Sequence, residues 1–311
     1  MKMTFVSILF AICGFSSFHA QESIEVSPAF EVLREFDKVR DFTMDRSGKE
    51  AYVTIQSATE EVSVISKLTK TGDSWGIEVA PFSGTFKDLE PFLALNGLRL
   101  YFVSNRPFED SEQIPKDYDI WYVERSSQNS AWGKPKNLGA PINSESNEFY
   151  PSLSKNGNLY FTSDREGTMG KDDIFFSSWT QKGYASPVAL DENINSEGFE
   201  YNAYISQDES YLLFGGYRRV DGLGSGDLYI SYNDGTGRWS KAKPLPAHIN
   251  SKYMDYCPFV DEANEQIYFT SRRDEVPDSS LNSIQNLREY LNSYQNGSSR
   301  IYKATFSPIK E

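Results

Sequence analysis

The chain has 311 residues, with 31 Lys and Arg against 44 Asp and Glu, which gives a formal net charge of −13. This excess of acid argues against nucleic acid and against anionic membrane surfaces as partners, because both require clustered Lys and Arg. Aromatic residues make up 14% of the chain, with 19 Tyr and 21 Phe, which suits a sheet-rich core.

The first 20 residues, MKMTFVSILFAICGFSSFHA, have the layout of a secretory signal peptide. One positive charge is followed by an apolar run from Phe5 to about Phe15, and cleavage is expected after Ala20. The run is too short to span a bilayer comfortably. We therefore expect an exported protein without a membrane span, whose domain covers residues 21–311.

Beyond this segment the sequence holds one cysteine, Cys257, and one histidine, His248. A single Cys cannot form a disulfide within the chain, and a single His excludes a metal site with two His ligands. A Ser-His-Asp arrangement has only His248 as a candidate, and that residue lies in a repeated phrase, HINS, where other copies have Pro or Asn. The sequence therefore predicts no cofactor and no metal.

Five copies of one unit follow each other along the chain. Each has an apolar entry, a turn, an apolar strand, a third strand such as DIWYV (119–123) or DIFFS (173–177), and a connector such as HINS (248–251). The second strands, such as LYFTS (159–163), are apolar at consecutive positions, which is typical of strands covered on both faces. The copies recur every 49 to 60 residues, a length that suits a four-stranded blade of a β-propeller, at anchors Phe42, Pro91, Pro151, Ala203 and Pro258.

The outer strand of each of the first four copies is expected to open on an aromatic residue: Trp75, Trp132, Tyr184 and Trp239. The fifth copy stops after its third strand, RIYKA (300–304), whereas EVSPAFEVL (25–33) precedes the first copy without a partner. We expect this N-terminal strand to complete the last blade, because closing the ring removes exposed sheet edges.

The last copy contains an insertion in which apolar residues recur at helical spacing. The pattern predicts one amphipathic helix over about residues 278–296, capped by Asp278 or Ser279 and stopped by Gly297. Two interpretations stay open, a helix that packs on the propeller itself and a lid or partner-binding helix.

The phrase PSLSKNGNLYFTSDREG (151–167), followed by DDIF and echoed at 91–122 and 258–302, resembles the WD40-like propeller repeat of the TolB type. The resemblance covers essentially the whole chain after the signal peptide. It implies an all-β, five-bladed propeller, with six blades, as in TolB, as the alternative. It also implies a location in the periplasm or cell envelope of a Gram-negative bacterium, or secretion from it.

The loops between second and third strands, which start at Asn105, Asp164, Tyr217 and Arg272, vary in length and open on the same end of the ring as the connectors. Pockets favour the face with long loops, so the site is expected there. The residues predicted for this ligand or partner face are Arg106, Arg165, Arg218, Arg273, Asp164 and Tyr217.

The four arginines occupy equivalent positions, and an acid precedes the matching anchor by three residues: Asp88, Glu148, Glu200 and Asp255. One interpretation is a set of structural ion pairs that hold connector to loop, since the Arg fork suits a carboxylate. The other is a ring of Arg that binds an anionic ligand.

Two loops resemble ligand loops without meeting their requirements. Asp164, Glu166, Asp172 and Asp173 lack the alternating spacing of a compact calcium loop. The glycines at 222, 224 and 226 precede a strand, whereas a phosphate-binding loop precedes a helix.

The leading hypothesis is an exported, non-catalytic propeller that binds a protein or peptide on its loop face. The alternative is a glycan-active enzyme, a glycoside hydrolase or lyase, which needs two carboxylates about 5 to 10 Å apart at the ring mouth. Asp41 and Asp221 would be candidate acids for it, and the glycan would then be the partner. A purely structural envelope component is a third class.

Overall fold

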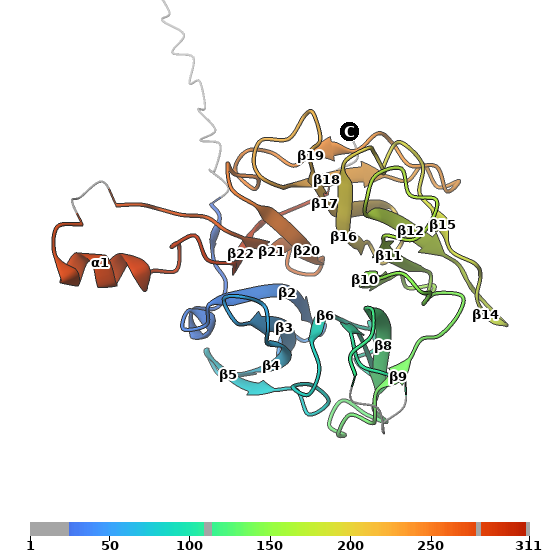
Figure 1. Ribbon diagram of the computed structural model, residues 1–311, viewed down its shortest axis with the longest axis horizontal. Coiled ribbons are helices and arrows are strands. Elements are labelled where there is room, and N and C mark those ends of the chain that lie inside the picture. Colours follow the sequence, from blue (N-terminus) through green and yellow to red (C-terminus); the bar gives the residue numbers. More distant parts are fainter. Residues whose placement is uncertain (1–24, 109–113, 278–280, 309–311) are drawn as a thin grey trace, which may run out of the picture.

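Each of the five repeats folds into a four-stranded antiparallel sheet, and the sheets stand around one axis (Figure 1). The computed structural model describes residues 25–108, 114–277 and 281–308. The predicted five-bladed β-propeller is confirmed. The expected signal peptide and the candidate helix caps Asp278 and Ser279 lie outside the described residues.

The blades follow the chain, with the first strand of each repeat at the axis. From the axis outward, blade 1 consists of β2 (Lys38–Met44), β3 (Glu50–Gln56), β4 (Ser63–Thr71) and β5 (Ser74–Val79), and blade 2 of β6 (Asp88–Leu93), β7 (Arg99–Ser104), β8 (Asp119–Glu124) and β9 (Lys136–Asn137). Blade 3 consists of β10 (Glu148–Leu153), β11 (Leu159–Ser163), β12 (Asp173–Ser177) and β15 (Val188–Ala189), and blade 4 of β16 (Phe199–Ile205), β17 (Tyr211–Tyr217), β18 (Asp227–Tyr232) and β19 (Lys243–Pro244). Blade 5 consists of β20 (Asp255–Asp261), β21 (Gln266–Ser271), β22 (Arg300–Thr305) and β1 (Ser27–Pro28).

The core lies between neighbouring blades. The second strands supply equivalent phenylalanines that are fully buried, and residues of adjacent blades share each hydrophobic cluster. Fully covered strands of this kind explain why the repeat is apolar at consecutive positions, since both sheet faces exclude water. The four phenylalanines are Phe102, Phe161, Phe214 and Phe269.

The N-terminal strand closes the ring as predicted. β1 pairs antiparallel with β22, and the Ala29 amide donates to the Ile301 carbonyl at 3.0 Å. Behind it, Phe30 and Leu33 are buried among side chains of blades 1 and 5, with Leu33 in the short 3-10 helix η1 (Glu31–Leu33). The seal between the first and last blades is therefore apolar as well as hydrogen-bonded.

The outer strands differ from the expectation in three blades. β5 contains Trp75, but β9, β15 and β19 are two-residue strands that begin after the aromatic residue. Trp132 instead donates from Nε1 to the Tyr52 hydroxyl of blade 1 at 2.8 Å, and Tyr184 lies in a separate hairpin of β13 (Trp179–Thr180) and β14 (Gly183–Tyr184). Trp132 and Tyr184 therefore make contacts outside the outer strands of their blades. The sequence pattern does not distinguish an aromatic residue of this kind from one that begins an outer strand.

The connectors fix each blade to the next. Their isoleucines, Ile142, Ile194 and Ile249, are buried, and the Asn after each bonds the backbone of its own blade's third strand. Asn143, for example, accepts from the Ile120 amide at 3.0 Å and donates to the Ile120 carbonyl at 2.9 Å. The repeated HINS phrase is therefore a structural motif, and His248 within it is exposed.

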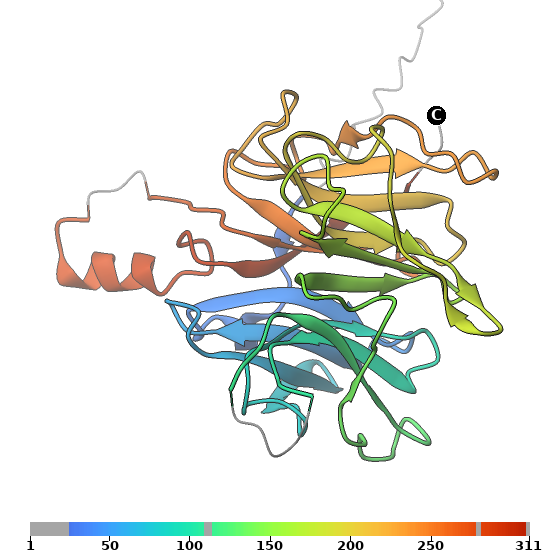
Figure 2. The same cartoon turned by 45° about the vertical axis from the view of Figure 1, so that its right-hand side comes forward.

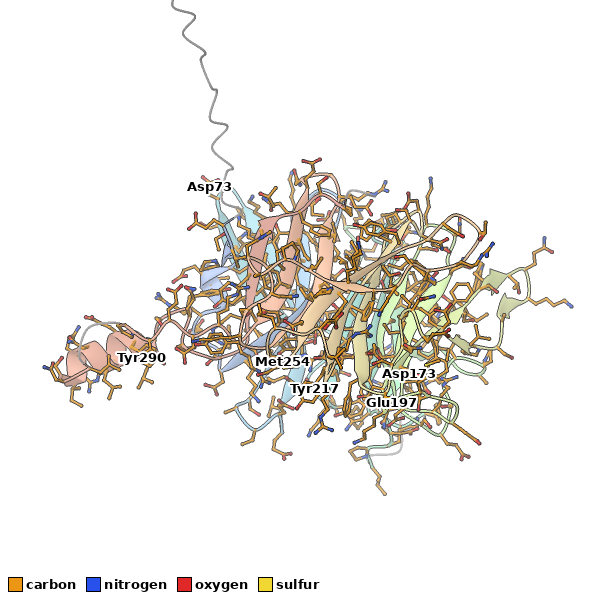
Figure 3. All side chains as sticks on the ribbon, turned by 90° about the horizontal axis from the view of Figure 1, so that it is seen from above. Asp73, Asp173, Glu197, Tyr217, Met254 and Tyr290 are labelled. Atoms are coloured by element: carbon orange, nitrogen blue, oxygen red, sulfur yellow. The ribbon has the colours of Figure 1, made fainter. Side chains whose placement is uncertain are left out.

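The insertion forms an arm that leaves blade 5 and extends away from the propeller (Figures 1 and 2). Its helix, α1 (Ile284–Leu291), is shorter than predicted; the Ser283 side chain caps it by accepting from the Asn286 amide. No side chain of α1 is buried, so the helix does not pack on the propeller surface (Figure 3). Across the described ranges, no helix is long and apolar enough to cross a bilayer.

Candidate functional site

A ring of five residues surrounds the axis, one from each blade. Each directly precedes the repeat anchor, sits at an irregularity in its inner strand and has a positive φ between 48° and 58°. Such a φ is unusual for residues other than glycine, and backbone irregularities of this kind re-aim side chains. The axial ring consists of Asp41, Glu90, Tyr150, Asn202 and Cys257.

The axial ring is one hydrogen-bonded network centred on Arg40 of blade 1. The Arg40 guanidinium donates to Asp41 at 2.9 Å and to Glu90 at 2.9 Å, and it lies over the Tyr256 ring. The Cys257 thiol lies 2.8 Å from Asp41 Oδ1, and Glu90 Oε2 accepts from the Tyr150 amide at 2.7 Å. Asn202 of blade 4 lies 3.3 Å from the Cys257 thiol and donates to Glu90 at 3.5 Å, so the network joins all five blades.

Burial shifts the titration of this network. It raises the pKa of Glu90 to about 7, a shift that Arg40 opposes and Asp41 reinforces. Burial, followed by the charge of Asp41, raises the pKa of the Cys257 thiol well above its usual value. The pKa of Arg40 is raised by its acidic neighbours even though burial opposes the charge. Cys257 is therefore a neutral thiol rather than a nucleophilic thiolate at physiological pH.

The axial ring is covered on both sides. Toward the tight-turn face, aromatic and proline side chains such as Phe92 and Phe259 leave a cavity of about 10 Å³, too small for more than about one water. Toward the loop face, Tyr201 and Met254 pack against the cluster of Tyr150, Tyr256 and Cys257. Asp41 and Glu90 retain 1% and 4% exposure, so they are not open at a ring mouth.

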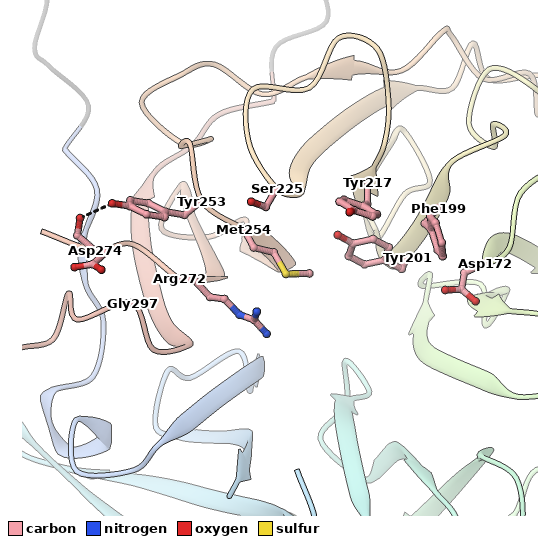
Figure 4. Close-up of a pocket in the computed structure, with 10 residues that line it drawn as sticks. All are labelled: Asp172, Phe199, Tyr201, Tyr217, Ser225, Tyr253, Met254, Arg272, Asp274 and Gly297. Atoms are coloured by element: carbon pink, nitrogen blue, oxygen red, sulfur yellow. Dashed lines mark hydrogen bonds between the residues drawn. The ribbon is translucent and has the colours of Figure 1, made fainter. Parts of the chain in front are cut away.

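A groove of about 560 Å³ opens on the loop face, above Tyr201 and Met254 (Figure 4). Blades 3, 4 and 5 and the base of the arm contribute to it, which places it on the face predicted from loop lengths. Its lining is rich in aromatic side chains and carries one arginine and two aspartates. The lining residues are Asp172, Phe199, Tyr201, Tyr217, Ser225, Tyr253, Met254, Arg272, Asp274 and Gly297.

The groove's charges lie apart from each other. Asp172 lies at the blade 3 end and Asp274 at the blade 5 end, with Arg272 pointing into the space between (Figure 4). Burial, then the charge of Asp164, raises the pKa of Asp172. Asp274 accepts from the Tyr290 hydroxyl of the arm at 2.8 Å. The two aspartates of the groove therefore occupy its opposite ends.

The repeated arginines and acids lie together within each of blades 2 to 5. Arg106 bonds Asp88 at 2.6 Å and the Phe82 carbonyl at 3.1 Å, which ties the loop to the preceding connector. Each acid is fully buried and also accepts from a connector serine hydroxyl, as Glu148 does from Ser144 and Asp88 from Ser83. The other pairs are Arg165–Glu148 at 2.7 Å, Arg219–Glu200 at 2.7 Å and Arg273–Asp255 at 3.5 Å.

Blade 4 departs from the alignment, because Arg219 and not Arg218 bonds Glu200. Arg218 has a φ of 62°, which turns its side chain outward. Its guanidinium lies over the rings of Phe199 and Tyr217, at 5.8 and 5.4 Å from their centroids. Arg218 is therefore a cation at the rim of the groove, next to the predicted face residue Tyr217.

The other candidate residues have local roles. Asp164 accepts from the backbone and side chain of Asn147, both at 2.8 Å, and Asp221 accepts from the Tyr229 hydroxyl at 3.0 Å. In the part of the chain that is described, no group of three or more His, Cys, Asp or Glu could hold a metal ion. Gly224 sits so close to the Ser251 and Tyr253 carbonyls that a Cβ would clash, so packing explains this glycine.

Sequence reasoning missed the axial ring and most of the groove. Asp41 is a candidate acid in the sequence, whereas the equivalent positions Glu90, Tyr150, Asn202 and Cys257 have no predicted role. The signal was present, because polar or reactive residues of different kinds occupy one position of an otherwise repeated unit. Nothing in the repeat marks Tyr253 or Met254 as neighbours of Tyr201.

Neither a family model nor a curated protein matches this sequence. Among solved structures, a TolB-type protein from Agrobacterium tumefaciens is 14% identical, with 92% of this chain and 98% of that chain covered and a TM-score of 0.50. The catalytic domain of a GH62 α-L-arabinofuranosidase from Coprinopsis cinerea is 11% identical, with coverage of 91% and 96% and a TM-score of 0.53. The α-L-arabinofuranosidase from Podospora anserina, solved with cellotriose, is 12% identical, with coverage of 91% and 96% and a TM-score of 0.51. These likenesses show a shared propeller fold.

Proposed function

We propose that the chain is an exported, non-catalytic binding module that binds a segment of a protein or peptide in the groove on its loop face. The observation that carries the proposal is the separation of the axial acids from the groove. Asp41 and Glu90 are bonded to Arg40 and covered on both sides, whereas the groove beside them is open. The signal-like N-terminus supports export to the periplasm, the cell envelope or the medium.

The composition of the groove supports a polypeptide ligand. Protein interfaces are enriched in Tyr, Phe, Met and Arg relative to the rest of the surface. The groove combines three tyrosines, a phenylalanine, Met254 and Arg272 in one concave site. Tyrosine suits such a surface because it offers a large contact area with a polar tip.

A glycan-active enzyme is the second candidate, favoured by the structural likeness to arabinofuranosidases. Glycoside hydrolysis commonly uses two carboxyl groups about 5 to 10 Å apart across the scissile bond. Asp172 and Asp274 come from blades 3 and 5 and lie at opposite ends of the groove (Figure 4), and Asp274 is bonded to Tyr290. This arrangement is the reason that we rank binding above catalysis.

The test compares peptide binding with glycan turnover on the same purified chain. A displayed library of random peptides should yield binders, and Tyr217→Ala should weaken their binding at least about tenfold, as loss of an aromatic anchor does. Val188→Ala, an exposed apolar side chain on the outer strand of blade 3, should leave binding unchanged. Arabinan- and xylan-derived oligosaccharides are assayed in parallel for hydrolysis.

Absence of any enriched peptide would overturn the proposal. Hydrolysis that is abolished by Asp41→Asn or Asp172→Asn, in variants that melt like the parent chain, would establish the enzyme instead.

A further inference from the structure

Arg272 is held in place and still has free hydrogen-bonding capacity. Its amide donates to the Met254 carbonyl at 3.0 Å, and its Nε donates to the Ser299 hydroxyl at 3.3 Å. Ser299 Oγ is itself 2.9 Å from the Tyr256 hydroxyl, so the anchor is part of the blade 5 core. Within the described ranges the two terminal nitrogens of Arg272 have no hydrogen-bond partner, and they point into the groove (Figure 4).

Other arginines of the propeller use their terminal nitrogens on acids of the fold. A terminal nitrogen of Arg40 donates to Glu90 while its Nε donates to Asp41, and a terminal nitrogen of Arg219 donates to Glu200 at 2.7 Å. The nearby Glu60 carboxylate is taken by Lys38, at 2.7 Å. An anchored guanidinium with a free terminal edge is suited to a carboxylate, because the planar fork forms two parallel charge-assisted bonds.

The groove around Arg272 sets the rest of the ligand's chemistry. Tyr201, Tyr217 and Phe199 form the wall across from the guanidinium (Figure 4). Asp172 at the far end makes no hydrogen bond through its side chain to any described residue. A carboxylate is therefore attracted to Arg272 and repelled from Asp172 and Asp274 at the two ends of the groove, while the aromatic wall favours an apolar neighbour.

We propose that the groove binds a peptide segment in which a carboxylate, placed against Arg272, adjoins an aromatic or large apolar side chain placed against the Tyr201–Tyr217 wall. This inference rests on the proposed function and adds the ligand class. Arg272 is the residue that selects the acid, and Arg218 at the rim adds a second positive charge. On a chain of net charge −13, these two local positive charges offset the repulsion between the chain and an acidic ligand.

An acidic sugar shares the carboxylate but fits the wall less well. Sugars bind aromatic residues through exposed ring faces. The rings of Phe199 and Tyr217 lie against each other, with centroids 5.7 Å apart, and Arg218 covers both. Side chains that insert edge-on between Tyr201, Met254 and Tyr253 suit this surface better than a flat sugar ring.

The probe is a displayed hexapeptide library in which Phe is fixed and the next residue is Glu, Gln or Lys, with the other positions random. We expect the Glu set to be enriched over the Gln and Lys sets by about tenfold to hundredfold, the usual gain from one charge-assisted pair. On the Arg272→Gln chain the Glu preference should vanish, and on Arg272→Lys it should be reduced. Arg46→Gln, an exposed arginine on the opposite face, should behave like the parent chain.

Each other outcome has a distinct meaning. Equal enrichment of the Glu and Gln sets would overturn the carboxylate inference and leave the peptide-binding function in place. Binding of oligogalacturonate that requires Arg272, without enrichment of any peptide set, would overturn the peptide assignment. If neither the hexapeptide sets nor random peptides bind, the proposed function itself fails. Thermal melting of each variant checks that its fold is retained.

Discussion

The axial ring and the groove lie next to each other, and both contain an arginine close to acids. The two arginines differ in whether their terminal nitrogens are bonded to groups of the fold. At the axis, Arg40 is bonded to Asp41 and Glu90, and the acids are almost fully buried. In the groove, Arg272 is exposed and its terminal nitrogens are free of partners among the described residues. Charges whose partners lie within the fold fix the structure, whereas anchored charges without such partners remain available to a ligand.

Removing the central arginine of the axial ring should have the largest effect. Arg40→Met leaves two buried carboxylates without their cation, which typically costs about 3–5 kcal/mol. Because Arg40 keeps 19% of its side chain exposed, we expect the lower end of that range. Urea unfolding measures the loss, and Arg272→Met, the same change in the groove, should cost less than about 0.5 kcal/mol. Equal losses of unfolding free energy in the two variants would contradict the claim that Arg40 stabilises the fold and Arg272 does not.

Two adjacent arginines provide a matched pair in blade 4. Arg219→Ala leaves the fully buried Glu200 without its partner, and we expect a loss of about 3 kcal/mol in unfolding free energy. Arg218→Ala removes only exposed ring contacts, worth about 0.5–1 kcal/mol. Chemical denaturation of both variants decides which of the two arginines is structural. A larger loss for Arg218→Ala would contradict the assignment.

The buried Glu90 should make the stability of the ring depend on pH. Its pKa of about 7 in the folded chain lies above the ordinary value of 4.5 expected when unfolded. The folded state therefore binds the proton more tightly, so this contribution is fully present below pH 4.5 and is lost as the pH rises through 7. The stability of the parent chain relative to Glu90→Gln should fall by on the order of 1–3 kcal/mol across that interval. A flat difference would contradict the buried, protonatable Glu90.

The thiol should be the weakest contributor to the ring. Cys257→Ala removes the group that faces Asp41 and should cost about 1–2 kcal/mol, whereas Cys257→Ser keeps a donor there and should cost less. In the native chain a thiol reagent such as DTNB should react only at the rate of unfolding, since Cys257 is fully buried. Rapid labelling under native conditions would show that the axis is open.

The sequence revealed the features that are repeated or periodic. Five copies of a turn and an apolar strand predicted the blades, and the missing outer strand of the last copy predicted the pairing of residues 25–33 with it. The connector phrase recurs in the sequence, and in the structure its isoleucines are buried and its asparagines bond the backbone. All of these depend on local pattern or on counting strands, which a single sequence carries.

The remaining features depend on backbone geometry and on contacts between distant repeats. Arg219 rather than Arg218 bonds Glu200 because Arg218 has a positive φ. The residue type at position 218 does not predict this backbone conformation. The groove joins Tyr201, Tyr253 and Arg272, which become neighbours only after three blades have assembled. The arm was predicted as a helix from its spacing, but its position away from the body could not be derived from that spacing.

The pairing of β1 with β22 brings the two ends of the propeller sequence into one sheet. The first strand of the ring to be synthesised pairs with the last, so β1 has no strand partner until residues 300–305 have been synthesised. A chain interrupted anywhere before residue 300 would present an open sheet edge and an exposed Phe30. Resistance of the N-terminal strand to proteolysis would therefore report that the ring has closed.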